Sequence, residues 1–113
     1  MKNWHKQRTI LTKQLISDAL LMLLKTHDIN KISIRELAQN AGINRTTFYN
    51  HYGNQYDVLD EIVTNHIENT SNLLIHNLSK QVQITECLTK VLSYVQENSE
   101  FFKIILQQQH YSL

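Results

Sequence analysis

The sequence predicts an all-α protein, with a three-helix head at its N-terminus and further helices after it. Two observations predict this fold class. The 113 residues contain no proline and only two glycines, Gly42 and Gly53, so few positions interrupt a helix. Apolar residues also recur at spacings of three and four along several stretches, as they do on the buried side of an amphipathic helix.

The first predicted helix covers residues 9–26. It follows a polar, basic segment at residues 1–8, which we expect to be a flexible arm. The apolar residues of the helix keep the spacing of one buried side. They are Leu15, Ile16, Ala19, Leu20, Leu23 and Leu24. Residues 27–31 break the pattern and predict a loop.

A short second helix is marked by its capping residues. Ser33 and Glu36 have the spacing of a capping box, in which each side chain satisfies a backbone N–H at the start of a helix. This helix is predicted to run to about Asn40, and Gly42 then supplies a sharp turn.

The third helix begins after Asn44, a good N-cap, and is predicted to end near Tyr52. There we expect Gly53 to adopt the left-handed backbone conformation. Two short helices joined by a tight glycine turn, after a longer first helix, have the helix-turn-helix arrangement. Residues 9–53 are therefore predicted to be one helix-turn-helix domain.

Three more helices are predicted in residues 54–113, which we expect to hold a long connecting helix and part of a second helical domain. Asn54 caps the long helix, which ends near residues 79–81, and a further helix covers about residues 84–97. Ser99 is expected to cap a last helix at about residues 100–109. The apolar residues of the long helix are Val58, Leu59, Ile62, Val63, Ile67, Leu74 and Leu78, and those of the next are Leu88, Val91, Leu92 and Val95.

Charge separates along the chain, although the formal net charge is only +1. Residues 1–56 carry eight lysines and arginines against three acidic residues, a balance of +5. Residues 57–113 carry three lysines against seven acidic residues, a balance of −4. A basic first half is the electrostatic feature expected of a domain that binds a polyanion.

The third predicted helix has two chemically different sides. Phe48 is expected to pack inward on Leu37 and Ala38, and Ile34 and Ile43 extend this apolar seam. The outward side then carries Arg45, Thr46, Tyr49 and Asn50. Arginine can pair with guanine, threonine with an acceptor or a thymine methyl group, and asparagine with adenine. This pattern favours double-stranded DNA as the partner.

The segment from Ile32 to Tyr52 resembles a known DNA-binding signature. It reads ISIRELAQNAGINRTTFYNHY and is similar to the TetR family of bacterial regulators. The first helix and the sequence Asp57-Val58-Leu59 also resemble that family, so the resemblance covers about residues 9–65. It implies a homodimer, usually a repressor, whose C-terminal helical domain binds a small molecule and releases a near-palindromic operator.

The resemblance also implies roles for single residues. Ser33 would hold the helix start against the DNA backbone, and Gln55 is found where the family commonly has a phosphate-binding lysine. The side chains implied to face base edges are Arg35, Arg45, Thr46 and Thr47, and those implied to contact phosphate or a neighbouring base are Tyr49 and His51. Because glutamine lacks the lysine charge, a second hypothesis remains: a helical protein-interaction module or co-activator with reduced DNA affinity.

Catalysis, cofactors and metals are not expected. The sequence has no nucleophile elbow, no phosphate-binding glycine loop and no paired carboxylates, and an enzyme would need an unrecognised site among His66, Cys87 and Tyr94. No two of the six histidines have helical ligand spacing. Cys87 is expected to be a small buried side chain, with redox sensing as the alternative. One cysteine, no visible signal peptide and no long apolar run predict a cytoplasmic protein without a membrane partner.

A candidate ligand pocket is expected in the second half. His66, Tyr94 and Phe101, with Phe102 beside them, fall where the family binds effectors, although such side chains also serve as ordinary core. TetR-like proteins are longer than this sequence, so we expect either a missing C-terminal part or an abbreviated effector domain. Apolar sides of residues 84–106 would then be uncovered and promote association.

Overall fold

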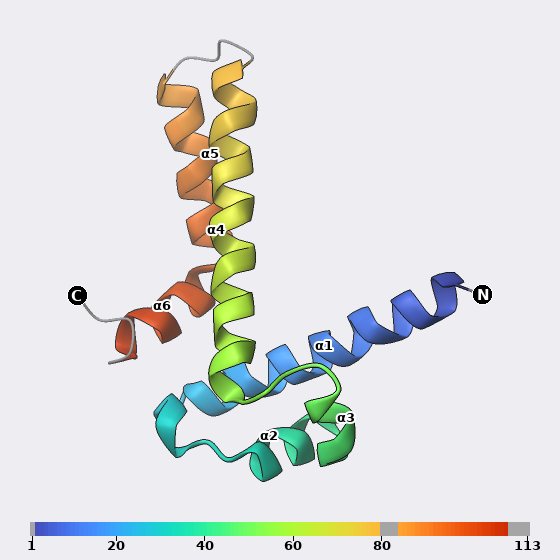
Figure 1. The fold of residues 1–113 in the computed structure, drawn as a ribbon. Helices are drawn as coiled ribbons and strands as arrows, with labels where there is room; N and C mark the ends of the chain where they lie inside the picture. Colours follow the sequence, from blue (N-terminus) through green and yellow to red (C-terminus); the bar gives the residue numbers. More distant parts are fainter. Residues whose placement is uncertain (1, 80–83, 109–113) are drawn as a thin grey trace. The chain divides into compact units, whose positions relative to one another are not determined.

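A computed structural model describes residues 2–79 and 84–108 of the chain, with side chains from Trp4 onward and excluding residues 77–79. Over these residues the fold consists of α-helices, one 3₁₀ turn and no strand, which confirms the all-α prediction (Figure 1). The chain divides into two compact units, Met1–Glu61 and Ile62–Leu113, which are described separately. The division falls inside α4 (Gln55–Ser79). The reason is that Val58 and Leu59, in the first turns of α4, are fully buried.

Helix α1 (Lys2–Leu24) begins earlier than predicted, and the expectation of a flexible arm at residues 1–8 is wrong for the described part of that segment. No glycine or proline interrupts it, and lysine, glutamine and arginine are good helix formers. The Arg8 guanidinium also lies 5.5 Å from the centre of the Trp4 ring, one turn earlier. The arm is therefore the first part of a long helix.

The buried side of α1 is narrower than the sequence predicted. Ile16, Ala19, Leu20 and Leu24 are buried as expected, but Leu15 is 43% exposed. Adjacent residues on a helix differ in direction by about 100°, so Leu15 and Ile16 cannot both face the same narrow contact. Ile16 takes the inward position in this helix.

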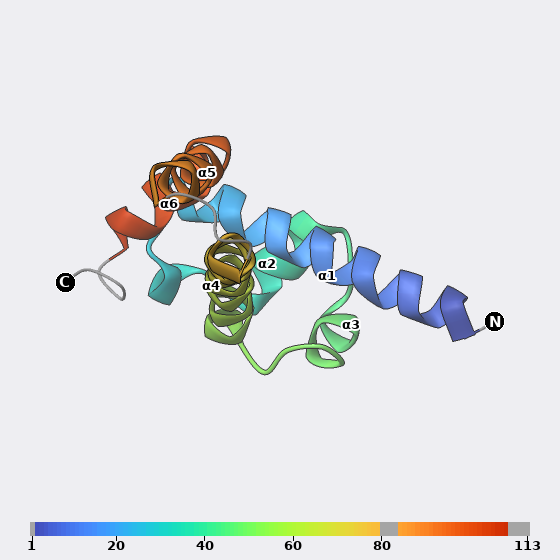
Figure 2. The same ribbon diagram turned by 90° about the horizontal axis from the view of Figure 1, so that it is seen from above.

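The other elements of the first unit are a 3₁₀ turn (Ile29–Lys31), α2 (Ile34–Ala41) and α3 (Arg45–Tyr49). Seen from above, α2 runs beside α1, and α3 follows it after a short turn (Figure 2). Hydrophobic burial holds this unit together. The large side chains with under 2% exposure all belong to it: Phe48, Ile16, Leu20, Ile32, Leu37, Leu59 and Val58.

The second unit contains the rest of α4, then α5 (Ile84–Glu97) and α6 (Ser99–Gln107). The expected Ser99 cap is wrong: Asn98 holds the N-cap position and makes no side-chain capping bond. Its amide instead donates to the Tyr94 carbonyl at 2.9 Å, near the end of α5. Cys87 is buried and free, as expected. No described helix has both the length and the apolar character required to cross a membrane.

Candidate nucleic-acid interface

The start of α2 is fixed by the predicted capping box. The Glu36 backbone N–H donates to the Ser33 hydroxyl oxygen at 3.0 Å, and the Ser33 backbone N–H donates to a Glu36 carboxylate oxygen at 3.3 Å. Two backbone donors that the helix itself leaves unpaired are thus satisfied. The first residues of α2 are held in a defined position, with Arg35 exposed.

The turn between α2 and α3 depends on Gly42. Its φ of 75° lies in the left-handed region, which glycine adopts without steric cost. The Ile43 backbone N–H donates to the Ala38 carbonyl at 3.0 Å, so the chain reverses immediately after α2. This confirms the predicted turn and sets the start of α3.

Helix α3 is short, capped and anchored by one aromatic side chain. The Thr47 backbone N–H donates to the Asn44 side-chain oxygen at 2.8 Å, as the N-cap prediction required. Phe48 is 0% exposed, and Leu37 and Ala38 of α2 are also buried. The inward orientation of Phe48, on which the functional hypothesis depends, is therefore confirmed.

The end of α3 differs from the prediction. The helix stops at Tyr49, and the backbone N–H groups of His51 and Tyr52 both donate to the Phe48 carbonyl at 3.0 Å in a tight turn. The left-handed conformation expected for Gly53 is wrong, since Gly42 alone among the two glycines has positive φ. The Gly53 N–H instead donates to the Asp57 carboxylate at 2.9 Å.

The nine side chains predicted to contact DNA fall into two groups by exposure. Six are exposed: Ser33, Arg35, Arg45, Thr46, Tyr49 and Asn50. Three are half-buried: Thr47, His51 and Gln55. Arg45 makes no ion pair with any residue that the structure describes. Tyr49 is 55% exposed, although its ring edge contacts Phe48. The residue types suited to DNA thus project from α3 beside a fully buried neighbour.

Gln55 differs from this group because its side chain is already bonded. Its amide donates to the Ile29 carbonyl at 3.3 Å, within the first unit. This bond ties the first turn of α4 to the 3₁₀ turn. A phosphate contact through the Gln55 side chain would have to compete with that bond.

A hollow of about 330 Å³ lies between α2 and the start of α3. Two of its lining residues are arginines, and none is acidic, so its electrostatic potential favours an anionic or electron-rich group. The residues that line it are Arg35, Ala38, Gln39, Ile43, Asn44 and Arg45. Its two arginines were predicted to contact DNA, whereas Gln39 was not.

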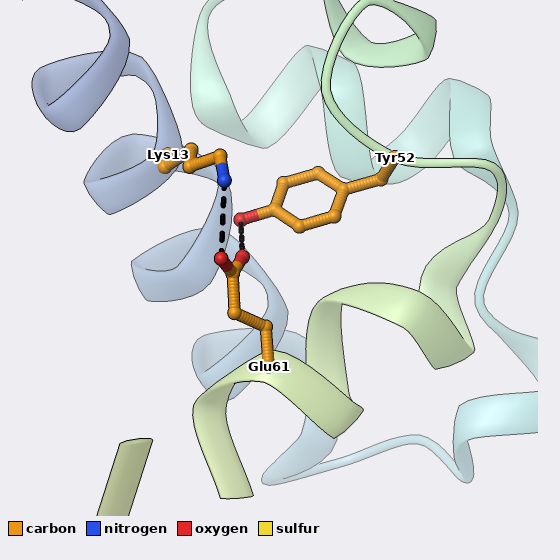
Figure 3. A network of polar contacts seen from close by, with 3 residues as sticks. All are labelled: Lys13, Tyr52 and Glu61. Atoms are coloured by element: carbon orange, nitrogen blue, oxygen red, sulfur yellow. Dashed lines mark hydrogen bonds and ion pairs between the residues drawn. The ribbon is translucent and has the colours of Figure 1, made fainter. Parts of the chain in front are cut away.

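A polar cluster of Lys13, Tyr52 and Glu61 anchors Tyr52, which follows α3. The Tyr52 hydroxyl donates to one Glu61 carboxylate oxygen, and the Lys13 ammonium lies 3.0 Å from the other (Figure 3). Lys13 also lies 5.5 Å from the centre of the Tyr52 ring. These residues come from α1, the segment after α3, and α4. The cluster could not be predicted from sequence spacing, because Lys13 and Glu61 are 48 positions apart.

The contacts within this cluster shift the pKa values of Tyr52 and Glu61 in opposite directions. Burial, followed by the bond to Glu61, raises the pKa of the Tyr52 hydroxyl well above its usual value. Burial alone would raise the pKa of Glu61, but bonds from Tyr52 and Lys13 and nearby positive charge outweigh it and lower that pKa. A neutral tyrosine therefore donates to a charged carboxylate, which is a strong type of hydrogen bond.

The three residues of the candidate ligand pocket meet in the second unit. His66 stacks on Phe101 with ring centres 3.9 Å apart, and its Nδ1 lies 2.5 Å from the Tyr94 hydroxyl oxygen. Burial lowers the pKa of His66. A small cavity of about 120 Å³ adjoins His66 and Phe101, but Tyr94 does not line it. The lining residues are Val63, His66, Ile67, Thr70, Phe101, Phe102 and Ile105.

Known bacterial regulatory proteins are similar to this chain. Residues 16–62 match the family described as "Bacterial regulatory proteins, tetR family". The chain is 31% identical over 99 residues to the "HTH-type dhaKLM operon transcriptional activator DhaS" of Lactococcus lactis, covering 88% of this chain and 51% of that protein. It is 25% identical over 101 residues to the "Uncharacterized HTH-type transcriptional regulator YxbF" of Bacillus subtilis, covering 85% of this chain and 27% of that protein. The chain thus spans about half of one curated relative and about a quarter of the other. No solved structure is significantly similar to it.

Proposed function

We propose, from the premise that this chain belongs through residues 16–62 to the tetR family of bacterial regulatory proteins, that it is a sequence-specific DNA-binding transcriptional regulator. One observation carries the proposal. Phe48 is fully buried while its neighbours Arg45 and Tyr49 are exposed on the same short helix. A helix that is anchored to the core by one buried side chain can enter a major groove and present its exposed side chains to base edges.

The proposed regulator has a defined oligomeric state and a defined effect on transcription. The regulator binds a near-palindromic operator as a homodimer, because two-fold pairing presents two recognition helices about one DNA turn apart. Its expected output is repression that a small molecule relieves. The Lactococcus relative is named an activator. A promoter–reporter assay with and without the chain therefore decides the sign, and increased expression would contradict repression.

The proposed effector site is the cavity beside His66 and Phe101. Its lining is mainly apolar and aromatic, and His66 and Thr70 are the lining residues with polar side chains. Ligand pockets of proteins commonly have this character. A His66→Ala variant should keep operator binding but lose the response to the effector. Loss of operator binding in that variant would contradict the assignment.

The central experiment is a titration of the chain against DNA at several salt concentrations. Duplexes enriched from a random pool are compared with a shuffled duplex of the same length. A DNA-binding regulator should enrich a defined sequence and lose affinity steeply as salt rises, because phosphate contacts release counterions. Failure to enrich any sequence at micromolar protein would overturn the proposal.

A second candidate function is a protein-interaction module or co-activator of low DNA affinity. The bond from Gln55 to the Ile29 carbonyl favours it, since this amide is not free for phosphate where the family commonly has a lysine. A Gln55→Lys variant separates the two candidates. If the chain is a DNA-binding regulator, the variant should bind the same enriched sequence more tightly. A chain that gains only sequence-independent binding would support the second candidate.

A further inference from the structure

The hollow between α2 and α3 contains a polar side chain that neither the motif nor the family resemblance assigned. Gln39 lies on α2 one turn after Arg35, and both are exposed. Gln39 also lines the same hollow as Arg45, the first residue of α3. The hollow therefore brings together side chains from the two helices of the motif.

Two other amide side chains of this region, Asn44 and Asn40, already have intramolecular partners. The Asn44 side-chain oxygen accepts the capping bond from Thr47, and the Asn40 amide donates to the Glu36 carbonyl at 2.9 Å. Among the described residues, the Gln39 carboxamide has no hydrogen-bond partner. It can therefore offer both a donor and an acceptor to a molecule that enters the hollow.

We propose that Gln39 is a specificity-determining residue that reads an adenine next to the base read by Arg45; this inference rests on the proposed function. A glutamine carboxamide matches the N6 donor and N7 acceptor of adenine, whereas an arginine fork matches the two acceptors of guanine. Because Gln39 and Arg45 share one hollow, they meet neighbouring base pairs. Ala38 and Ile43 form the apolar part of the hollow and add no competing polar group.

The experiment uses the full chain and duplexes enriched from a random pool. Gln39→Ala is compared with the parent on every single-base variant of the enriched sequence. The expected result is a loss of about tenfold to a hundredfold in discrimination at one A·T pair, with preferences elsewhere retained. Arg45→Ala should lose discrimination at a base pair directly beside that one.

Asn40→Ala is the matched control, because Asn40 is exposed on the same helix but does not line the hollow. It should leave every preference unchanged. Uniform weakening of Gln39→Ala on all duplexes would mean a phosphate contact and overturn the inference. An unchanged preference profile would overturn it as well, while the proposed function would stand. If the parent enriches no sequence, both fail together.

Discussion

The two units of the chain differ in how they cover their apolar side chains. In the first unit, side chains from α1, α2, α3 and the start of α4 are fully buried, with Phe48 among them. In the second unit, one side of α5 leaves Ile84, Leu88 and Leu92 largely exposed. Burial of apolar area is the main stabilising contribution to a fold. The candidate DNA-binding residues are therefore held by a well-packed core, whereas many apolar residues of the second unit contribute little to the stability of that unit.

The largest effect should come from removing the central side chain of the first unit. Phe48→Ala leaves a cavity and should lower the free energy of unfolding by about 3–5 kcal/mol. Urea denaturation followed by circular dichroism measures this loss. Tyr49→Ala is the matched control, because Tyr49 is exposed next to Phe48 and should change stability little. If Phe48→Ala and Tyr49→Ala lost the same free energy of unfolding, Phe48 would not be the central support of the first unit.

The next effect concerns binding rather than stability. Arg45→Ala should weaken operator binding by about 1–3 kcal/mol and relax the preference at one base pair. Its melting temperature should match that of the parent, since Arg45 is exposed and unpaired among the described residues. Equal affinity of parent and variant for every operator-like duplex would show that Arg45 does not read DNA.

Loss of a helix cap should have an intermediate effect on the first unit. Ser33→Ala removes the acceptor of the Glu36 backbone N–H and should cost about 1 kcal/mol of stability. Thermal unfolding of the two proteins at the same concentration provides the measurement. Ser33→Asp, which retains a capping acceptor, should recover most of the loss. A variant as unstable as the alanine protein would argue against capping as the cause.

The polar cluster should make the first unit sensitive to acid. Tyr52→Phe removes one hydrogen bond and should cost about 0.5–1.5 kcal/mol near neutral pH. Because the pKa of Glu61 is lowered in the fold, its stabilising contribution is present above the pKa of the unfolded chain and is lost as pH falls through the lower, folded value. The parent should therefore lose more stability than Glu61→Gln on acidification below about pH 4.5. The free energy of unfolding of both proteins is measured by urea denaturation at each pH. If the parent and Glu61→Gln lose the same amount as pH falls, this role for Glu61 is contradicted.

The smallest effect is expected on the exposed side of α5. Leu92 is 67% exposed, so Leu92→Gln should change the free energy of unfolding by no more than about 0.5 kcal/mol. Denaturant titration of the dilute protein tests this value. A loss of several kcal/mol would show that this side of α5 is covered in solution, and sedimentation of both proteins would then reveal association.

Local signals explain why much of the interface could be predicted from the sequence. Ser33 with Glu36, and Asn44 with Thr47, interact over three positions, so their bonds are visible as spacing. The turn at Gly42 was predictable because the glycine lies directly between the two short helices that it joins. The Lys13–Glu61 pair has no such signal, because only the tertiary fold brings those residues together. The left-handed conformation predicted for Gly53 is absent because the Gly53 N–H donates to the Asp57 carboxylate, a contact that the spacing of glycines does not reveal.

The exposure of single positions was harder to predict than the helices themselves. Leu15 and Ile16 are both apolar, and only packing against the other elements decides which of them points inward. Gln39 illustrates the same limit in the interface, because nothing in the sequence shows that it shares a hollow with Arg45. Periodicity therefore predicts where a helix lies more reliably than it predicts which residues each side chain contacts.

The tight turn at Gly42 has a consequence for insertions and deletions. The bond from the Ile43 N–H to the Ala38 carbonyl and the Asn44 cap together set the position at which α3 starts. One extra residue between Ala41 and Arg45 would break one of these two contacts and displace Phe48 from the buried side chains of α2. Substitutions on the outer side of α3 alter which operator is recognised, but a change in the length of this turn should abolish recognition altogether.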